Sequence, residues 1–539
     1  MIHNKTILLI CKERRSLAMF HLGKELEKNN KVHYFFVHYT EVLNRNNYNK
    51  ETFFYFKDKI KNENIHDVKD INVEFLKNRK NIKIDYNRLK EIEKKYTYFA
   101  GLNKQILSSQ ATSTAYHDRF YFNPTTYDQN LYWLLLNYNK TESLLEKIKP
   151  DCIFGLDDNG EIQKTIINEI ANYKKIPFIL IEHSRYKSIH IPIFSLGRNL
   201  DKYFVDAYNK NKNDNDCKKY IEDVQNYRAQ SNIMPEIYKN QITSSYDVSF
   251  WETIKVILEK TYIFFKALFD LITNDKYGVG LNTPLYSNLL KRILIWYMYS
   301  FKKFYLYSRF NKYFSKPSDE KYLYMPLHKI PESSTYVAAP MYINEMNLIE
   351  AISKSMPISW KLYVKEHQSM IGERSFDFYK KIKKLHNVRL VKSNFYKDPK
   401  PWIEKSLCVI TITGTTGFEA SMLNKPVIVL GNILYRAIPS VKVAKNFNEL
   451  EALFKEIENN DGSYDNIRDC ATYLKTINEF GISIDLNYLM LLSWKKIQPQ
   501  SLDGVEEKDL NSMLKNLMIF YEKALIAYNN TENKNKREI

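Results

Sequence analysis

Residues 407–420 read Leu-Cys-Val-Ile-Thr-Ile-Thr-Gly-Thr-Thr-Gly-Phe-Glu-Ala, and this stretch says more about the architecture than any other. The apolar run from Leu407 to Ile412 predicts a buried strand, and a helix is expected to begin at Phe418. A strand that passes through a tight turn directly into a helix is half of a β-α-β unit. The stretch therefore predicts a parallel sheet.

The turn between this strand and this helix has the composition of an anion-binding loop. The first amides of a helix lack partners within the helix, and the positive end of the helix dipole lies behind them. Gly414 and Gly417 allow a ligand to approach the backbone, while Thr413, Thr415 and Thr416 add hydroxyl donors. The loop is not a Walker A motif, because no Gly-Lys-Ser/Thr follows. The alternative is a tight turn with threonine caps and no ligand.

Strands and helices alternate on both sides of this turn, as in doubly wound α/β lobes. Towards the C-terminal half, strands are expected at 322–327, 360–364, 388–391, 407–412 and 426–430, with helices at 341–355, 376–385, 401–406 and from 418. In the N-terminal part, strands are expected at 5–11, 32–37, 151–155 and 177–181, with helices at 16–29, 131–148 and 161–173. The sequence thus predicts two α/β lobes.

Polar residues follow the N-terminal strands where ligands of open α/β sheets bind. Asp157 and Asp158 come after the strand at 151–155, and residues 182–185 (Glu-His-Ser-Arg) follow the next strand. One of the two acids is a candidate general base for deprotonating a hydroxyl nucleophile. Caps or turn residues are an equally good account of the pair from spacing alone.

Three further polar segments lie in the second lobe. Lys365-Glu366-His367 ends the strand at 360–364, and a histidine there can donate to a phosphate or a leaving group. His328 and Glu332 follow the strand at 322–327. Each of these is also a common loop residue, but their place in the same lobe as the Thr/Gly turn favours a shared site.

Charge and cysteine usage limit the class of protein. The formal net charge is +18, which attracts polyanions. No zinc-finger spacing or RNA-binding aromatic signature is present, so an anionic membrane surface or an acidic sugar ranks above nucleic acid. Five scattered cysteines suit a reducing cytoplasm, and Cys11, Cys152 and Cys408 lie in or beside apolar runs. Without a long apolar run, the protein is expected to be cytoplasmic.

Residues 291–316 contain seven Lys or Arg and no Asp or Glu, and ten aromatic residues lie between Trp296 and Phe314. This pattern fits an amphipathic helix at the surface of an anionic inner membrane. It fits equally a helical linker that packs aromatic side chains between two lobes.

Taken together, these segments resemble the bacterial capsular polysaccharide biosynthesis family, whose members include β-Kdo transferases. The resemblance is dense over about 320–440 and patchy over about 1–200. It is carried by Pro326-Leu327-His328, Pro331-Glu332, Leu362 to His367, Phe378-Tyr379, Asn387 to Leu390, Thr413 to Ala420, Lys425 to Ile428, Lys149-Pro150-Asp151, Ile176-Pro177 and Ser184-Arg185.

The resemblance implies a GT-B fold, in which two Rossmann-like lobes enclose the active site, and a metal-independent transfer with the nucleotide held by the second lobe. Related transferases of CMP-activated acid sugars carry an acidic pair before glycine, a His-Pro pair and a Ser/Thr turn. Asp157-Asp158, His367 and Thr413 to Thr416 are similar to these three features. Asn159 separates the acids from Gly160, and Gln368 stands where the family has proline.

We therefore predict four parts in the 539 residues. They are an acceptor lobe (1–205), a helical basic and aromatic insertion or linker (206–316), a nucleotide-sugar lobe (317–445) and a helical C-terminal extension with a frayed tail (446–539).

The predicted function is an inverting, metal-independent glycosyltransferase that moves sugar from a nucleotide donor, with CMP-Kdo-like sugars as candidates, to a growing capsule polysaccharide or glycolipid. The nucleotide sugar is the substrate, and no cofactor or metal is expected. The alternatives are an enzyme resembling a nucleotide-sugar epimerase and a non-catalytic capsule assembly protein. The candidate catalytic residues are Asp157, Asp158 and His367, and the candidate nucleotide-binding residues are Thr413, Gly414, Thr415, Thr416, Gly417, Glu419, Lys365, Glu366, His328 and Glu332.

Overall fold

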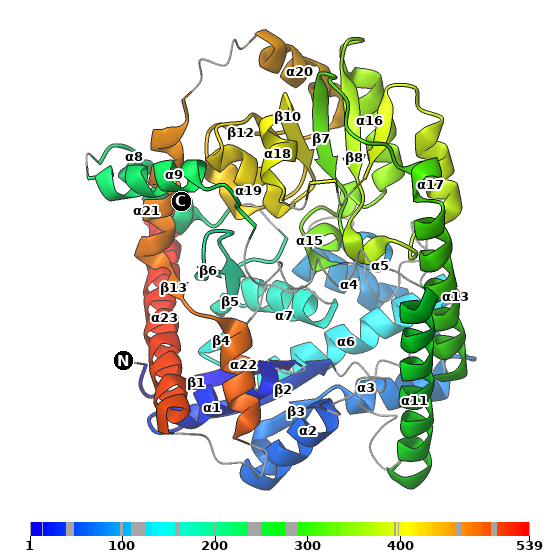
Figure 1. Cartoon of the computed structure of the whole chain (residues 1–539). Helices are drawn as coiled ribbons and strands as arrows, with labels where there is room; N and C mark the ends of the chain where they lie inside the picture. The colour runs from blue at the N-terminus through cyan, green and yellow to red at the C-terminus, as the bar shows by residue number, and fades with distance from the viewer. Residues whose placement is uncertain are drawn as a thin grey trace.

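The structure is a computed structural model, and Figure 1 shows two α/β lobes stacked on each other, the N-terminal one below. It describes the chain except for residues 1, 13–14, 39–47, 98–100, 109–124, 157–161, 198–199, 215, 235–249, 275–288, 331, 393–394, 397, 460–464, 497–503 and 538–539.

The sheet of the second lobe is entirely parallel, with the strand order β12-β11-β10-β7-β8-β9. Its strands are β7 (Tyr322–Pro326), β8 (Lys361–Lys365), β9 (Val388–Val391), β10 (Cys408–Thr411), β11 (Val427–Val429) and β12 (Val441–Val443). The chain builds one half outwards from β7 and the other outwards from β10. Ligands of such sheets bind where the order reverses, which here is at the carboxyl ends of β7 and β10.

Helices connect the strands of this lobe. They are α15 (Ser333–Tyr336), α16 (Glu345–Ser355), α17 (Phe376–Lys383), α18 (Lys400–Glu404), α19 (Thr415–Met422) and α20 (Leu450–Asn459). Local sequence defines their starts: the side chain of Asn344 accepts from the Asn347 amide at α16, and that of Ser375 accepts from the Phe378 amide at α17.

The sheet of the first lobe has the order β13-β6-β5-β4-β1-β2-β3. The parallel strands are β1 (Thr6–Lys12), β2 (Lys31–His38), β3 (Ile65–Asp67), β4 (Cys152–Phe154) and β5 (Phe178–His183); β6 (Ile189–Ile193) and β13 (Ile482–Ser483) are antiparallel to their neighbours. Its helices are α1 (Arg15–Leu26), α2 (Tyr48–Lys59), α3 (Lys69–Asn78), α4 (Tyr86–Tyr96), α5 (Gly101–Leu107), α6 (Tyr127–Ile148) and α7 (Ile162–Tyr173). The predicted fold class, two Rossmann-like doubly wound lobes with added helices, is confirmed.

The segment between the lobes is helical but packs in two separate places. Its helices are α8 (Lys202–Lys212), α9 (Lys218–Ala229), α11 (Phe250–Asn274), α13 (Leu289–Ser308) and α14 (Phe310–Tyr313). Helices α8 and α9 contact the C-terminal helix α21 (Ile467–Phe480), whereas α11 and α13 contact each other at the opposite side of the molecule (Figure 1).

The C-terminal residues return to the first lobe. After α21, β13 joins the first sheet, and α22 (Leu486–Lys495) and α23 (Gly504–Arg537) pack on α1. Tyr521 of α23 stacks on Phe154 with ring centroids 4.3 Å apart, and its hydroxyl donates to the Gly155 carbonyl at 2.9 Å. The helix also continues through residues 531–537, where the sequence suggested a frayed tail.

The two lobes share buried contacts where the strands of the second sheet end. Tyr473 of α21 donates to the Ser184 carbonyl at 2.7 Å, and Asn432, after β11, donates to the Gly197 carbonyl at 2.8 Å. Tyr186 and Phe418 pack edge to face. The carboxyl end of the second sheet therefore faces loops of the first lobe. All five cysteines are buried and unpaired. Within the described residues, no helix is both long and apolar enough to cross a membrane.

Candidate functional site

The Thr/Gly turn between β10 and α19 is held by its own polar groups. The Thr413 hydroxyl donates to the Ser334 carbonyl at 2.6 Å, and the Gly414 amide donates to Thr411 Oγ1 at 3.0 Å. Thr415 and Thr416, in the first turn of α19, are half-buried, and the structure gives their hydroxyls no partner among the described side chains. Of the three predicted threonines, Thr413 thus fixes the turn, whereas Thr415 and Thr416 remain available to a ligand.

Both glycines of the turn are sterically required. A Cβ atom on Gly417 would lie 2.4 Å from the hydroxyl of Tyr435, and one on Gly414 would lie 2.6 Å from Thr411 Oγ1. The Tyr435 hydroxyl also donates to the Gly414 carbonyl at 2.6 Å. Tyr435 therefore packs against the first turn of α19 and holds it, a role that no local sequence signal indicated.

His328 connects the turn to the end of β7. Its Nε2 lies 3.3 Å from the Thr413 amide, which can only donate, so Nε2 is the acceptor and Nδ1 carries the proton. Nδ1 lies 3.6 Å from Glu345 Oε1, and that oxygen accepts from the His328 amide at 2.8 Å. The structure thus places His328 beneath the turn, with Nε2 of its ring already bonded to the turn's backbone.

A buried ion-pair network supports His328. Arg374 Nη1 lies 2.6 Å from Glu345 Oε2, its Nε lies 2.9 Å from Glu366 Oε2, and its Nη2 donates to the His328 carbonyl at 2.7 Å. Tyr379 donates to Glu366 at 2.8 Å. Burial raises the pKa of Glu366, whereas Arg374 holds that of Glu345 below its usual value in spite of burial. Glu366, predicted as a nucleotide ligand, lies inside this network.

His367 comes two residues after the end of β8, close to His328 and Arg374. Its Nδ1 accepts from the Ser369 amide at 3.2 Å, which leaves the proton of the neutral ring on Nε2. Burial, and then the neighbouring His328 and Arg374, lower the pKa of His367 to about 4. At neutral pH the ring is therefore an uncharged Nε2–H donor.

Burial lowers the pKa of three other histidines, His21, His66 and His183, to about 4 as well. Between pH 6.5 and 4 the unfolded chain binds protons at these sites that the folded chain does not, so stability is complete above pH 6.5 and is lost as the pH falls towards 4. We expect the melting temperature to fall over this range in calorimetry. Replacing His21 with glutamine should make the decline shallower, and replacing the exposed His386 should not.

A second charged cluster lies beside the turn. Burial lowers the pKa of Lys365 to about 8, and burial together with the nearby Asp398 raises that of Glu419 to about 7. The Asp398 carboxylate accepts from the amides of Lys400 and Met234. Neither Lys365 nor Glu419 makes an ion pair with another described residue. The Lys365 ammonium at the end of β8 and the Glu419 carboxyl group on α19 thus both have pKa values close to neutral pH.

The first lobe contributes Arg185 to this region, from the loop between β5 and β6. The loop is tightly bonded: Ser184 Oγ donates to the Ile189 carbonyl at 2.7 Å, and the Arg185 amide donates to His183 Nδ1 at 3.1 Å. Arg185 has a φ of 72°, a left-handed conformation that is uncommon outside glycine and often marks functional sites.

The guanidinium of Arg185 has no ion-pair partner among the described residues, and its Nε is buried without a hydrogen bond. Burial raises the pKa of both Tyr435 and Tyr473, and the positive charge of Arg185 opposes that rise at each ring, so the guanidinium lies close to both. Because Tyr435 holds the first turn of α19, Arg185 stands near the Thr/Gly turn.

The other predicted residues lie apart from this group or outside it. Glu332 is half-exposed at the start of α15, where its carboxylate lies 3.7 Å from the Lys329 ammonium. Asp157 and Asp158 lie outside the described residues. No group of three or more His, Cys, Asp or Glu side chains in the described part of the chain is placed to hold a metal ion. Three residues of this region, Glu345, Asp398 and Tyr435, carry no signal in the sequence that marks them as part of a site.

No protein-family model matches the chain, and no curated protein matches its sequence. Solved structures similar to it include the UDP-GlcNAc 2-epimerase from Neisseria meningitidis bound to UDP-GlcNAc, with 14% identity and a TM-score of 0.27, over 88% of this chain and 98% of that one. The Staphylococcus aureus MnaA–UDP structure has 13% identity and a TM-score of 0.26, over 93% and 99%. The β-Kdo 2,7 transferase KpsC from Thermosulfurimonas dismutans has 12% identity and a TM-score of 0.28, over 62% and 80%. At these values the similarities distinguish no activity.

Proposed function

We propose that the chain is a glycosyltransferase that moves a sugar from a nucleotide-sugar donor to a growing surface polysaccharide or glycolipid. One observation carries the proposal: unpaired donors and cations from both lobes lie around the switch point of the second sheet. They are the first turn of α19, the Nε2–H of His367, Lys365 and Arg185. The phosphates of a nucleotide are the ligand that such a set fits.

The proposed donor site neutralises a leaving nucleotide with protein groups alone. The amides and hydroxyls of Thr415 and Thr416 would bind the phosphate nearest the sugar, and Lys365 and Arg185 would supply positive charge. His367 would donate its Nε2–H to the departing phosphate oxygen. Donors aimed at developing charge in a site that excludes water stabilise the transition state strongly. The proposal therefore involves no metal.

Glu419 is proposed to bind a hydroxyl of the nucleotide's sugar. It lies on α19, one turn after Thr415, and its pKa of about 7 results from burial and from Asp398. A carboxyl group accepts two hydroxyl hydrogen bonds when it is ionised.

The first lobe is proposed to bind the acceptor. Asp157 or Asp158 would remove the proton from the acceptor hydroxyl as it attacks the sugar carbon, which gives inversion at that carbon. The support for this role is the resemblance to transferases of acid sugars and the place of the pair after β4, the strand next to the switch point of the first sheet. A CMP-activated acid sugar is the donor that we propose on the same resemblance.

Two other functions remain distinguishable by experiment. An epimerase would convert the donor without any acceptor. A non-catalytic assembly protein would support polysaccharide formation after Asp157, Asp158 and His367 have been replaced.

The test is nucleotide-dependent thermal stabilisation. CMP, UMP, UDP, GDP and ADP are added separately to the protein and to its His367→Ala variant. We expect one nucleotide to raise the melting temperature, because a ligand that binds only the folded state stabilises it, and we expect the shift to shrink in the variant. A shift with CMP alone would support the acid-sugar donor.

The matched control is His386→Ala. His386 is an exposed histidine of the same lobe, located before β9 at the opposite end of the sheet. This variant should respond to the nucleotide as the unchanged protein does. If no nucleotide stabilises the protein, the donor site is refuted and the assembly-protein alternative gains support.

A further inference from the structure

Helices α11 and α13 form an antiparallel hairpin along one side of the molecule (Figure 1). The rings of Phe250 and Phe304 are 5.9 Å apart, and the hydroxyls of Thr261 and Tyr297 are hydrogen-bonded. The contact early in α11 is thus made with a residue late in α13, and the contact further along α11 is made with an earlier residue of α13, as in an antiparallel pair.

The described part of α11 exposes a continuous apolar stripe. Trp251, Leu258, Tyr262 and Phe265 recur at spacings of seven, four and three residues, which places them on one face of the helix. Trp251 is 76% exposed. The side chains that contact α13 lie on a different face, so this stripe is not used by the hairpin itself.

Helix α13 carries a matching stripe. Leu294, Met298, Phe301 and Tyr305 recur at spacings of four, three and four residues, and Leu294 is 65% exposed. These side chains are among the aromatic and aliphatic residues that a linker packed between two lobes would bury. The structure therefore does not support the linker account for this stripe.

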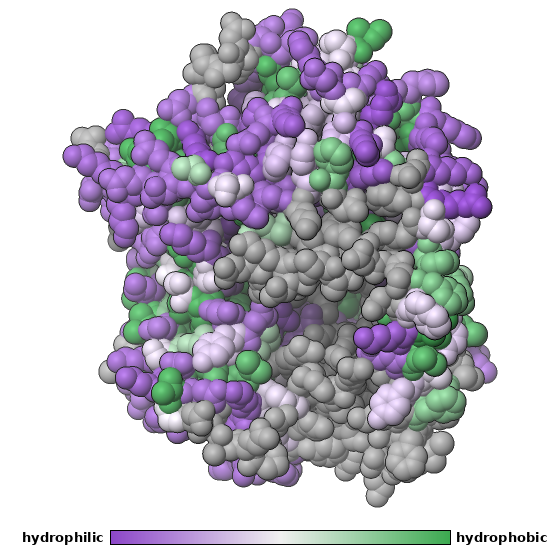
Figure 2. Space-filling model, viewed as in Figure 1, coloured by the Kyte–Doolittle hydropathy of each residue, from purple (hydrophilic) through white to green (hydrophobic). Residues whose placement is uncertain are grey.

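Both stripes face the same side of the hairpin. Successive residues of a helix are about 100° apart around its axis. On each of the two helices, this spacing puts the exposed stripe roughly a quarter to a third of a turn away from the face that contacts the other helix, in the same rotational sense. Because the two helices run in opposite directions, equal rotations bring the stripes to one side. Figure 2 shows hydrophobic and near-neutral residues where the hairpin lies in Figure 1, at the right of the view.

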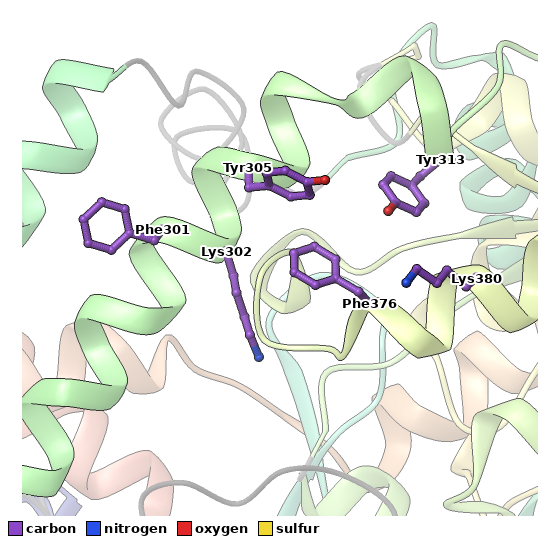
Figure 3. A pocket seen from close by; sticks show the side chains of 6 residues that line it. All are labelled: Phe301, Lys302, Tyr305, Tyr313, Phe376 and Lys380. Atoms are coloured by element: carbon purple, nitrogen blue, oxygen red, sulfur yellow. The ribbon is translucent and has the colours of Figure 1, made fainter.

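Basic side chains accompany this apolar face. Lys255 on α11 and Arg309 after α13 are exposed. At the end of α13, a groove of about 300 Å³ opens between α13, α14 and α17 (Figure 3). Tyr305 and Phe376 face each other in it, with ring centroids 5.2 Å apart. Lys302 and Lys380 also line the groove, so aromatic rings and ammonium groups stand together.

We propose that this face of the α11–α13 hairpin docks on an anionic lipid bilayer and lies in the plane of its headgroups. Exposed aliphatic and aromatic side chains enter the boundary between headgroups and acyl chains, while the lysines and arginine pair with lipid phosphates. The charge selects this occupant: residues 291–316 contain seven basic and no acidic residues, and a second copy of the chain would present the same positive charge. The inference does not depend on the proposed reaction.

The experiment is co-sedimentation with vesicles. The full chain is mixed with vesicles of phosphatidylcholine alone or with an equal mixture of phosphatidylcholine and phosphatidylglycerol. Binding to the mixed vesicles only is expected. The double variant Trp251→Ser with Leu294→Ser, which changes one stripe residue on each helix, should lose it. The matched control is Met341→Ser with Ile358→Ser, two exposed apolar residues outside the hairpin, and it should bind normally.

The charge contribution is measured separately with Lys255→Gln and Arg309→Gln. Each should weaken binding to mixed vesicles by about 5-fold, the effect of about 1 kcal/mol per basic residue near an anionic surface. Unchanged circular dichroism of every variant is the folding control.

Three outcomes would overturn the proposal. They are equal binding to both kinds of vesicle or to neither, a double variant that binds as the unchanged chain does, and sedimentation velocity showing a dimer that the stripe substitutions dissociate. The last result would assign the face to a second copy of the chain.

Discussion

Replacing Arg374 with methionine is expected to lower the free energy of unfolding by about 3–5 kcal/mol. Arg374 is the single guanidinium between two buried carboxylates, Glu345 and Glu366. Methionine keeps an unbranched apolar stem but has no charge, so both acids would remain buried without a cation. When one partner of a buried ion-pair network is removed, the charges that remain are still desolvated but are no longer compensated, and this destabilises the fold.

Urea unfolding followed by circular dichroism measures this loss. The control is Arg389→Met in the same lobe, because Arg389 is partly exposed and lies 3.5 Å from Glu320. A pair of that kind contributes at most about 1 kcal/mol. Adding Glu345→Gln and Glu366→Gln to the Arg374 variant should restore part of the stability, since neutral amides cost less to bury than carboxylates. Equal losses for Arg374→Met and Arg389→Met would show that the network does not stabilise the lobe.

The order of strands and turns could be predicted because it depends on residues that are close together in the sequence. The run that ends at Ile412 is apolar and β-branched, and the glycines and threonines after it leave little choice but a tight turn. Their spacing could not show which groups of the turn are already used. Thr413 and Thr415 are chemically alike, yet only the fold places the Ser334 carbonyl within reach of Thr413.

The supports of the site could not be predicted, because they depend on long-range contacts. Glu345 and Arg374 are ordinary polar residues of a helix and a loop in the sequence, and nothing local indicates that they meet. Likewise, nothing near Tyr435 in the sequence indicates that its side chain contacts the first turn of α19. The position of β13 next to β6 likewise follows from the return of the C-terminal segment to the first lobe, which no periodicity reports.

Replacing Arg185 with asparagine is expected to weaken nucleotide binding by about 10- to 100-fold. A charge-assisted hydrogen bond to a phosphate contributes about 1.5–3 kcal/mol, and Arg185 has no competing ion pair in the described structure. Asparagine is the substitution of choice because the residue has a φ of 72°, which asparagine adopts more readily than most other residues. The backbone of the loop should therefore be retained.

The measurement is titration calorimetry with the nucleotide that stabilises the protein most. Lys187→Asn is the matched control, since Lys187 lies in the same loop, also has a positive φ of 48°, and carries its ammonium 3.6 Å from Asp223. It should bind the nucleotide with nearly unchanged affinity. Equal weakening in both variants would mean that the loop, and not the guanidinium, matters to the site.

The same titration tests whether the two lobes form one site. Arg185 belongs to the first lobe, whereas the Thr/Gly turn and Lys365 belong to the second. If Arg185 and Lys365 contact the same phosphates, the two residues are energetically coupled, because residues that share a partner do not act independently. The loss of binding free energy in the double variant should then differ from the sum of the losses in the two single variants. Strict additivity of the two losses would place Arg185 outside the nucleotide site and leave the second lobe to bind the donor alone.

Raising the pH through about 8 should also weaken nucleotide binding, since Lys365 then loses its proton. This pH dependence of the affinity should be absent in a Lys365→Met variant.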